Sequence, residues 1–208
     1  MANIGKLIEE GKLQKAADLL PAPDEMESDF GTIEQTSVPA KTVFYSIRRN
    51  GNCAFEKKGP EKHKLFFFCK DTSLCIEALG EEYEDHLPIW EVCTKKELKI
   101  IRIKGWRHEF LKPYYKDYLD VGYYDEEKIL SYYLIKHNLD GFQAAAEMDQ
   151  TASSEKNLYE FAFLEDVVEK EIVIQRCLPV RELLQQKTKK RKLQREKKNK
   201  KRKRSLKF

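Results

Sequence analysis

Charge is divided between two regions of opposite sign, and this division decides which part of the chain can fold. Residues 187–208 contain 14 Lys and Arg against one acid, Glu196, which leaves a net charge of +13. The other 186 residues contain 25 Lys and Arg and 34 Asp and Glu, a net charge of −9. The basic segment has only Leu193, Leu206 and Phe208 to bury, so it cannot form a core of its own. A packed fold must therefore come from the residues before it.

Those residues are apolar enough for one ordinary domain, because the chain is 41% hydrophobic and 11% aromatic. We expect four regions along the chain. Residues 1–20 form an amphipathic N-terminal helix, 21–40 an acidic linker, 41–181 an α+β globular domain and 182–208 a basic tail, disordered or helical.

The N-terminal helix is predicted from apolar residues at helical spacing, which are Ile4, Leu7, Ile8, Leu13, Ala17 and Leu20. Pro21 and Pro23 end it, since proline cannot continue a helix. The polar segment that follows predicts a helix separable from the body. Its apolar stripe then favours contact with a protein partner or with a second copy of the chain.

Short β-branched and aromatic runs predict the strands of the body, at residues 42–47, 65–69, 89–93, 98–103, 158–164 and 171–177. Helices are expected at 71–79 and 125–138, each opened by acidic or capping residues. Strands outnumber helices and do not alternate with them, which is typical of an α+β fold. The tyrosines of residues 106–133 fit a lid over this core, or a surface on which bases stack.

No apolar run approaches 18 residues and the first residues lack a hydrophobic signal segment, so we expect no membrane contact and a cytosolic or nuclear location. The cysteines are Cys53, Cys69, Cys75, Cys93 and Cys177. They are odd in number and include no Cys-x-x-Cys pair, which favours free buried thiols and no metal site.

The basic tail carries the strongest functional signal. Two dense clusters of cations predict binding to the phosphates of DNA or RNA. Their spacing also matches a bipartite nuclear import signal, which predicts a nuclear protein. Two alternatives are a solubilising tail and an internal contact with the acidic body. The residues expected to bind nucleic acid are Lys189, Lys190, Arg191, Lys192, Arg195, Lys197, Lys198, Lys200, Lys201, Arg202, Lys203 and Arg204.

Phosphate-binding glycine loops and nucleophile elbows are absent from the sequence. The order of elements over residues 42–178 nevertheless resembles the ADP-ribosyltransferase-like fold of toxins, poly-ADP-ribose polymerases and some proteins of large DNA viruses. The residues that carry the resemblance are Val43-Phe44-Tyr45-Ser46, Phe66-Phe67-Phe68, Leu139-Asp140-Gly141-Phe142 and Glu160-Phe161-Ala162-Phe163.

The resemblance implies two small, mostly antiparallel sheets with flanking helices and NAD bound between them. It also implies a late-strand glutamate that stabilises the positive charge of the transition state, and Glu160 occupies that place. Tyr45 or Arg48 would hold the ribose, although Tyr45 stands where such families carry His or Arg. Arg48 would face the opposite side of the strand from Tyr45.

Three functions remain open on this evidence. The first is a nucleic-acid-associated protein with a non-catalytic or weakly active body, located in the nucleus. The second is an active NAD-dependent ADP-ribosyltransferase. The third is a structural protein that packs nucleic acid in a virion, or at a cytoplasmic replication site if the chain is viral.

Overall fold

A computed structural model of the chain describes residues 4–26, 33–47, 65–72, 75, 88–103, 105, 107–115, 121–145 and 159–180. The helices in these residues are α1 (Ile4–Glu9), α2 (Leu13–Leu19), α4 (Tyr123–Lys136) and α5 (Glu165–Glu171), with a 3₁₀ turn η1 (Arg107–Phe110). The strands are β1 (Glu34–Val38), β2 (Val43–Ile47), β3 (Leu65–Cys69), β4 (Pro88–Thr94), β5 (Leu98–Arg102), β6 (Gly141–Ala145), β7 (Tyr159–Leu164) and β8 (Ile172–Pro179).

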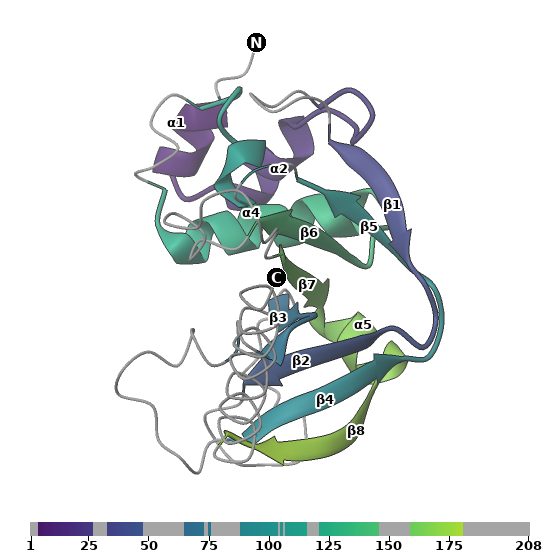
Figure 1. The fold of residues 1–208 in the computed structure, drawn as a ribbon. Helices are drawn as coiled ribbons and strands as arrows, with labels where there is room; N and C mark the ends of the chain where they lie inside the picture. Colours follow the sequence, from purple (N-terminus) through teal and green to yellow (C-terminus); the bar gives the residue numbers. More distant parts are fainter. Residues whose placement is uncertain are drawn as a thin grey trace, which may run out of the picture.

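All eight strands belong to one sheet, in the order β1-β5-β6-β7-β3-β2-β4-β8 (Figure 1). Only β5 and β6 run parallel among these strands, and the chain between them contains α4. Parallel neighbouring strands need a connection that returns the chain to the same end of the sheet. A helix usually forms this crossover, because a tight turn cannot span the length of a strand. The mixed α and β character of the body is therefore confirmed, but the expected pair of small sheets is wrong.

One bent ribbon runs through both parts of the sheet. β1 pairs with β5, and β2 pairs with β4. Between the two pairings, the Lys41 N–H donates to the Thr94 carbonyl at 2.8 Å and the Thr94 N–H donates to the Thr42 carbonyl at 3.1 Å. Hydrogen bonding thus continues around the bend, where Figure 1 shows β1 and β5 running into β2 and β4.

The ribbon also closes the sheet on itself. Its β5 end is bonded to β6 and its β2 end to β3, while β7 lies between β6 and β3. The strands therefore form a ring, and β8 extends outward from β4. A ring leaves few open strand edges, which protects a sheet from pairing with other chains.

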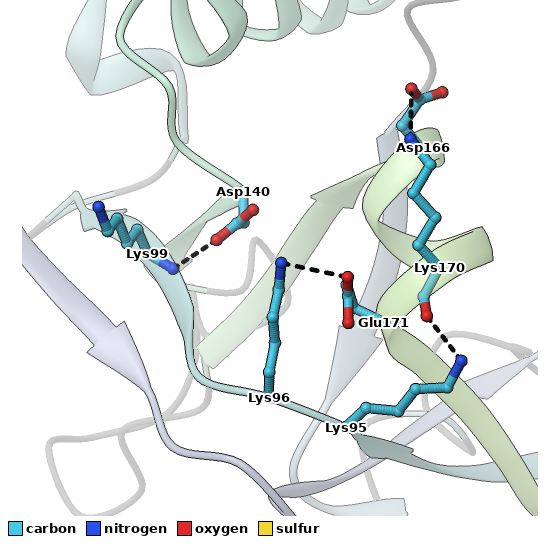
Figure 2. A network of polar contacts seen from close by, with 7 residues as sticks. All are labelled: Lys95, Lys96, Lys99, Asp140, Asp166, Lys170 and Glu171. Atoms are coloured by element: carbon cyan, nitrogen blue, oxygen red, sulfur yellow. Dashed lines mark hydrogen bonds and ion pairs between the residues drawn. The ribbon is translucent and has the colours of Figure 1, made fainter.

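Contacts with α5 and β6 hold the bend of the ribbon in place (Figure 2). The Lys95 N–H donates to the Glu171 carbonyl at 2.8 Å, and the Lys96 ammonium lies 3.1 Å from the Glu171 carboxylate. On the other side, the Lys99 N–H donates to the Asp140 carboxylate at 2.7 Å. Asp140 thereby fixes the start of β6 beside β5.

An aromatic core fills the inside of the ring. Phe44 lies at its centre and is fully buried, with ring centroids 4.9 Å from Phe161, 5.5 Å from Phe163 and 6.3 Å from Phe68. Such tilted and edge-on pairs are the arrangements that aromatic rings prefer. The aliphatic and other members of this cluster are Val38, Trp90, Val92, Leu98, Ile100, Val168 and Ile172.

The N-terminal segment is part of the body, contrary to the expectation of a single separate helix. Two short helices form instead, and Gly11 between them has a φ of +68°, a conformation that suits glycine. Their apolar residues belong to a second core cluster shared with α4, β5, β6 and β7. The Tyr133 hydroxyl of α4 donates to the Pro21 carbonyl at 3.0 Å, and the Lys136 ammonium donates to the Asp18 carbonyl at 2.7 Å.

The segment expected as a linker also contributes to the fold. It contains β1 at the edge of the sheet, and both Met26 and Ile33 are buried in the second cluster. Its polar composition suits an edge strand that buries few side chains, which is why it resembled a linker.

The remaining predictions have mixed outcomes. The six predicted strands and the helix at 125–138 are confirmed, with small shifts in their ends. Tyr133 is fully buried and Tyr132 packs against the same cluster, as a core lid requires. Most of the helix expected at 71–79 and the whole tail from residue 182 lie outside the described residues. No helix among those described is long and apolar enough to span a bilayer.

Candidate functional site

A row of mainly polar side chains crosses the outer face of the sheet. Residues opposite one another on paired strands point to the same side, so a continuous register aligns them across the sheet. The row consists of Arg176 on β8, Glu91 on β4, Tyr45 on β2, Cys69 on β3, Glu160 on β7 and Ala144 on β6. We call these six residues the polar row.

Glu91 is the electrostatic centre of the polar row. Arg176 donates to both of its carboxylate oxygens, from Nε at 2.9 Å and from Nη2 at 2.7 Å. Tyr45 lies directly opposite Glu91 in the pairing of β2 with β4. Burial, followed by the negative charge of Glu91, raises the pKa of Tyr45. The phenol therefore stays protonated near neutral pH and acts as a donor, not as a base.

A bulge in β8 brings Arg176 to this face. Glu91 pairs with Arg176 but the next residue, Val92, pairs with Ile174, so β8 accommodates one extra residue, Gln175. In an unbroken strand Ile174 and Arg176 would point to the same side. The extra residue lets Ile174 face the aromatic core while Arg176 faces Glu91, as bulges elsewhere redirect side chains.

A pair of thiols lies near the middle of the row, where Cys75 contacts Cys69. The Cys69 Sγ lies 2.9 Å from the Cys75 Sγ, and both side chains are buried. The Cys69 thiol also lies within hydrogen-bonding distance of two backbone carbonyls, 3.2 Å from that of Asp71 and 3.5 Å from that of Tyr45. Hydrogen bonding to Cys69 and burial raise the pKa of the Cys75 thiol.

A second charged cluster lies where η1 meets the start of α4. Arg107 is only 1% exposed, and its guanidinium lies 3.5 Å from the Glu126 carboxylate and 3.6 Å from that of Glu127. It also sits over the Phe67 ring, 5.2 Å from the centroid. Burial raises the pKa of Glu127, while the charge of Arg107 lowers it in part. The enclosure of these groups by η1, α4 and β3 is typical of a structural ion cluster.

The structure describes two of the three residues predicted for catalysis. Tyr45 and Glu160 point to the same side of the sheet, with Cys69 between them, while Arg48 lies outside the described residues. Glu91 and Glu160 lie on opposite sides of Tyr45 along the row, with Glu91 directly opposite Tyr45 on the next strand. The strand register thus pairs Tyr45 with Glu91, while Cys69 separates it from Glu160.

The other predicted sites have simple outcomes. All twelve tail residues expected to bind nucleic acid lie outside the described part of the chain. Among the residues that are described, no group of three or more His, Cys, Asp or Glu is arranged to hold a metal ion. Cys69, Cys75 and Cys93 are buried thiols, as expected, whereas Cys177 is exposed and Cys53 is not described.

Sequence reasoning missed Glu91, Arg176 and Arg107. Glu91 and Arg176 are 85 positions apart, and only the strand register brings them together. A single charged residue inside an apolar strand, as in Ile89-Trp90-Glu91-Val92-Cys93, was the available signal for Glu91. Comparison with protein-family models, with curated proteins and with solved structures found no match to this chain.

Proposed function

We propose that this is a nucleic-acid-associated protein that binds phosphates through residues 187–208, and that its body is a non-catalytic module. The observation that carries the proposal is the segregation of charge, +13 in this segment against −9 in the rest of the chain. Cations in such a segment neutralise backbone phosphates and release their counterions, which gives binding that depends on salt and ignores base sequence.

Features of the body support its assignment as a non-catalytic module. Both oxygens of the Glu91 carboxylate accept hydrogen bonds from Arg176, and the raised pKa of Tyr45 makes that phenol a poor base. The buried Arg107 cluster is enclosed among packed elements. A body with net negative charge repels phosphate, so affinity for nucleic acid belongs to the tail.

Charge-neutralising variants of the full chain test the proposal. Replacing Lys200, Lys201 and Lys203 with Gln should weaken binding to duplex DNA, and should reduce the slope of log affinity against log salt by about 3. For the unmodified chain, contact with about six phosphates predicts a slope near −5. The measurement is fluorescence anisotropy with a labelled duplex at several salt concentrations.

The matched control removes three cations from the exposed surface of the N-terminal helices, by replacing Lys6, Lys12 and Lys15 with Gln. The net charge of this variant equals that of the tail variant. Equal losses of affinity would indicate a net-charge effect and would contradict a binding site in the tail, as would affinity that does not change with salt.

A second candidate function, NAD-dependent ADP-ribosyl transfer, is favoured by one observation: Tyr45 and Glu160 face the same side of the sheet. On this alternative the Glu160 carboxylate stabilises the positive charge that develops on the ribose, so Glu160→Gln should lower turnover at least about a hundredfold without unfolding. Calorimetry with NAD should compare the full chain with the tail variant, because heat from dinucleotide phosphates bound by tail cations would fall in the variant, whereas heat from the body would not. Absence of heat at millimolar NAD would eliminate this candidate.

A further inference from the structure

Cys69 of the polar row and the adjacent Cys75 have a geometry that no other described cysteine shares. Cys69 ends β3 and is 7% exposed, while Cys75 is 3% exposed. Their sulfur atoms are 2.9 Å apart. A disulfide requires about 2.05 Å between sulfurs, so the two thiols need to approach by only about 1 Å. The two sulfur atoms are already in contact, and both cysteines belong to one short segment of the chain.

We propose that Cys69 and Cys75 are a modification site, a dithiol that a low-molecular-weight disulfide such as glutathione disulfide converts to an intramolecular disulfide. The ring that closes is short, and the partner thiol is in place before the first bond exchanges. In a reducing compartment, disulfides of this kind are transient and report on redox conditions.

The reaction balances in two exchanges. The thiolate of one cysteine attacks a sulfur of glutathione disulfide, and a glutathione thiolate leaves and takes up a proton. The second cysteine, as its thiolate, then attacks the protein sulfur of this mixed disulfide and releases the second glutathione. The protein loses two electrons and two protons, which reduce glutathione disulfide to two molecules of glutathione.

The order of attack follows from the environment of the two sulfurs. Hydrogen bonding to Cys69 and burial raise the pKa of Cys75, so Cys75 is rarely a thiolate in the reduced protein. Cys69 is therefore the first nucleophile and Cys75 the resolving thiol. Once Cys69 carries glutathione, its hydrogen bond with Cys75 is lost. The main cause of the raised pKa of Cys75 is then removed, and Cys75 ionises more readily.

Oxidation of Cys69 would change the hydrogen bonding within the polar row. The Cys69 thiol is within hydrogen-bonding distance of the backbone carbonyls of Tyr45 and Asp71, and a disulfide sulfur has no hydrogen to donate. The disulfide also ties the end of β3 to Cys75. Tyr45, which lies opposite Cys69 on the neighbouring strand, is the residue expected to report the change.

The test equilibrates the full wild-type chain with mixtures of glutathione and glutathione disulfide, quenches with acid, and alkylates the remaining thiols after unfolding. Peptide mass spectrometry should find Cys69 linked to Cys75, with both protected from alkylation and Cys93 alkylated. Because the linked peptide is read in the wild-type chain, the result does not depend on a variant folding.

A variant and a control sharpen the result. In Cys75→Ser, Cys69 should accumulate as the glutathione adduct, because no resolving thiol remains. Cys93 and Cys177 provide the matched control, since they pair with Val173 and Trp90 and are separated by about 10 Å along the strands. A chain in which Cys69 and Cys75 are alkylated while Cys177 is fully glutathionylated would overturn the proposal, as would linkage of Cys93 to Cys177.

Discussion

The buried Arg107 cluster permits a sharp test of the structure. Its guanidinium is 1% exposed, lies 3.5 Å and 3.6 Å from the carboxylates of Glu126 and Glu127, and stacks over Phe67. Arg107→Met keeps most of the side-chain volume but removes the charge. Two carboxylates then remain in a site that is largely shielded from water, with exposures of 7% and 21%.

The size of the destabilisation in Arg107→Met follows from these distances. With an effective dielectric constant of about 20, one ion pair at 3.5 Å has a Coulomb energy of about 5 kcal/mol, before the cost of desolvation is subtracted. Removal of one partner from a buried pair typically costs about 3–5 kcal/mol. Loss of the contact with the Phe67 ring adds about 1 kcal/mol. We therefore expect Arg107→Met to lower the free energy of unfolding by about 5 kcal/mol at neutral pH.

The loss of stability in Arg107→Met should depend on pH, and the direction follows from the pKa of Glu127. Burial raises the pKa of Glu127 above its ordinary value of 4.5, and Arg107 partly opposes this. In the variant the opposing charge is gone, so the folded-state pKa of Glu127 rises further. A folded state that binds the proton more tightly than the unfolded state gains stability as pH falls through the window above 4.5. The gap between variant and wild type should therefore narrow towards pH 5.

Urea unfolding at several pH values measures both effects. The matched control is Arg102→Met, because Arg102 pairs with Glu34 at a similar 3.6 Å but is 44% exposed. An exposed pair of this kind contributes up to about 1 kcal/mol. Equal losses for the two variants, or an Arg107 loss that stays constant from pH 7.5 to pH 5, would refute the argument from burial.

Two further predictions concern the packing of the sheet and helices, and both are measured as the free energy of unfolding in urea. Gly141→Ala should cost about 3 kcal/mol or more, because its Cβ would overlap the Ala162 carbonyl oxygen. Gly122→Ala, at the N-cap of α4 and with open space around its Cβ, should cost less than about 1 kcal/mol. Similar values for the two would contradict the β6–β7 pairing. Ile8→Ser, in the second core cluster, should cost about 2–4 kcal/mol, and Leu19→Ser, which is 44% exposed, less than about 1. A negligible loss for Ile8→Ser would show that the N-terminal helices are separable.

The parts of the fold that the sequence predicts are those set by local pattern. Apolar runs such as Leu65-Phe66-Phe67-Phe68-Cys69 bury both faces of a strand, and any partner strand satisfies them. β1 was missed because Glu34-Gln35-Thr36-Ser37 is polar and gains order from pairing with β5, which is distant in the chain. α5 was missed because seven residues are too few to establish a helical period between two strands.

The number of sheets was predicted wrongly for a different reason. Strand periodicity says which residues pair with something, but it does not specify the partner. A single sheet results because β7 pairs with β6 on one side and with β3 on the other, and so joins the two halves. The two backbone hydrogen bonds at Lys41 and Thr94 add a second connection at the bend. No local pattern in β7 identifies these partners, so two smaller sheets were expected, which is the arrangement that the family resemblance implied.

Local sequence pattern also fails to predict the polar row, because a single residue decides which side chains meet. Tyr45 and Glu160 could be chosen from the sequence as polar positions on strands, but Glu91 and Arg176 could not be paired with them. The reason is Gln175, because one extra residue in β8 changes which side Arg176 faces and no local pattern announces it. It follows that deleting Gln175 should leave Arg176 opposite Glu91, because Ile174 and Arg176 would become consecutive residues that point to opposite sides of a regular strand. Loss of the Glu91–Arg176 ion pair in that variant, reported by the fluorescence of Tyr45 beside Glu91, would contradict the assignment of Gln175 as the extra residue.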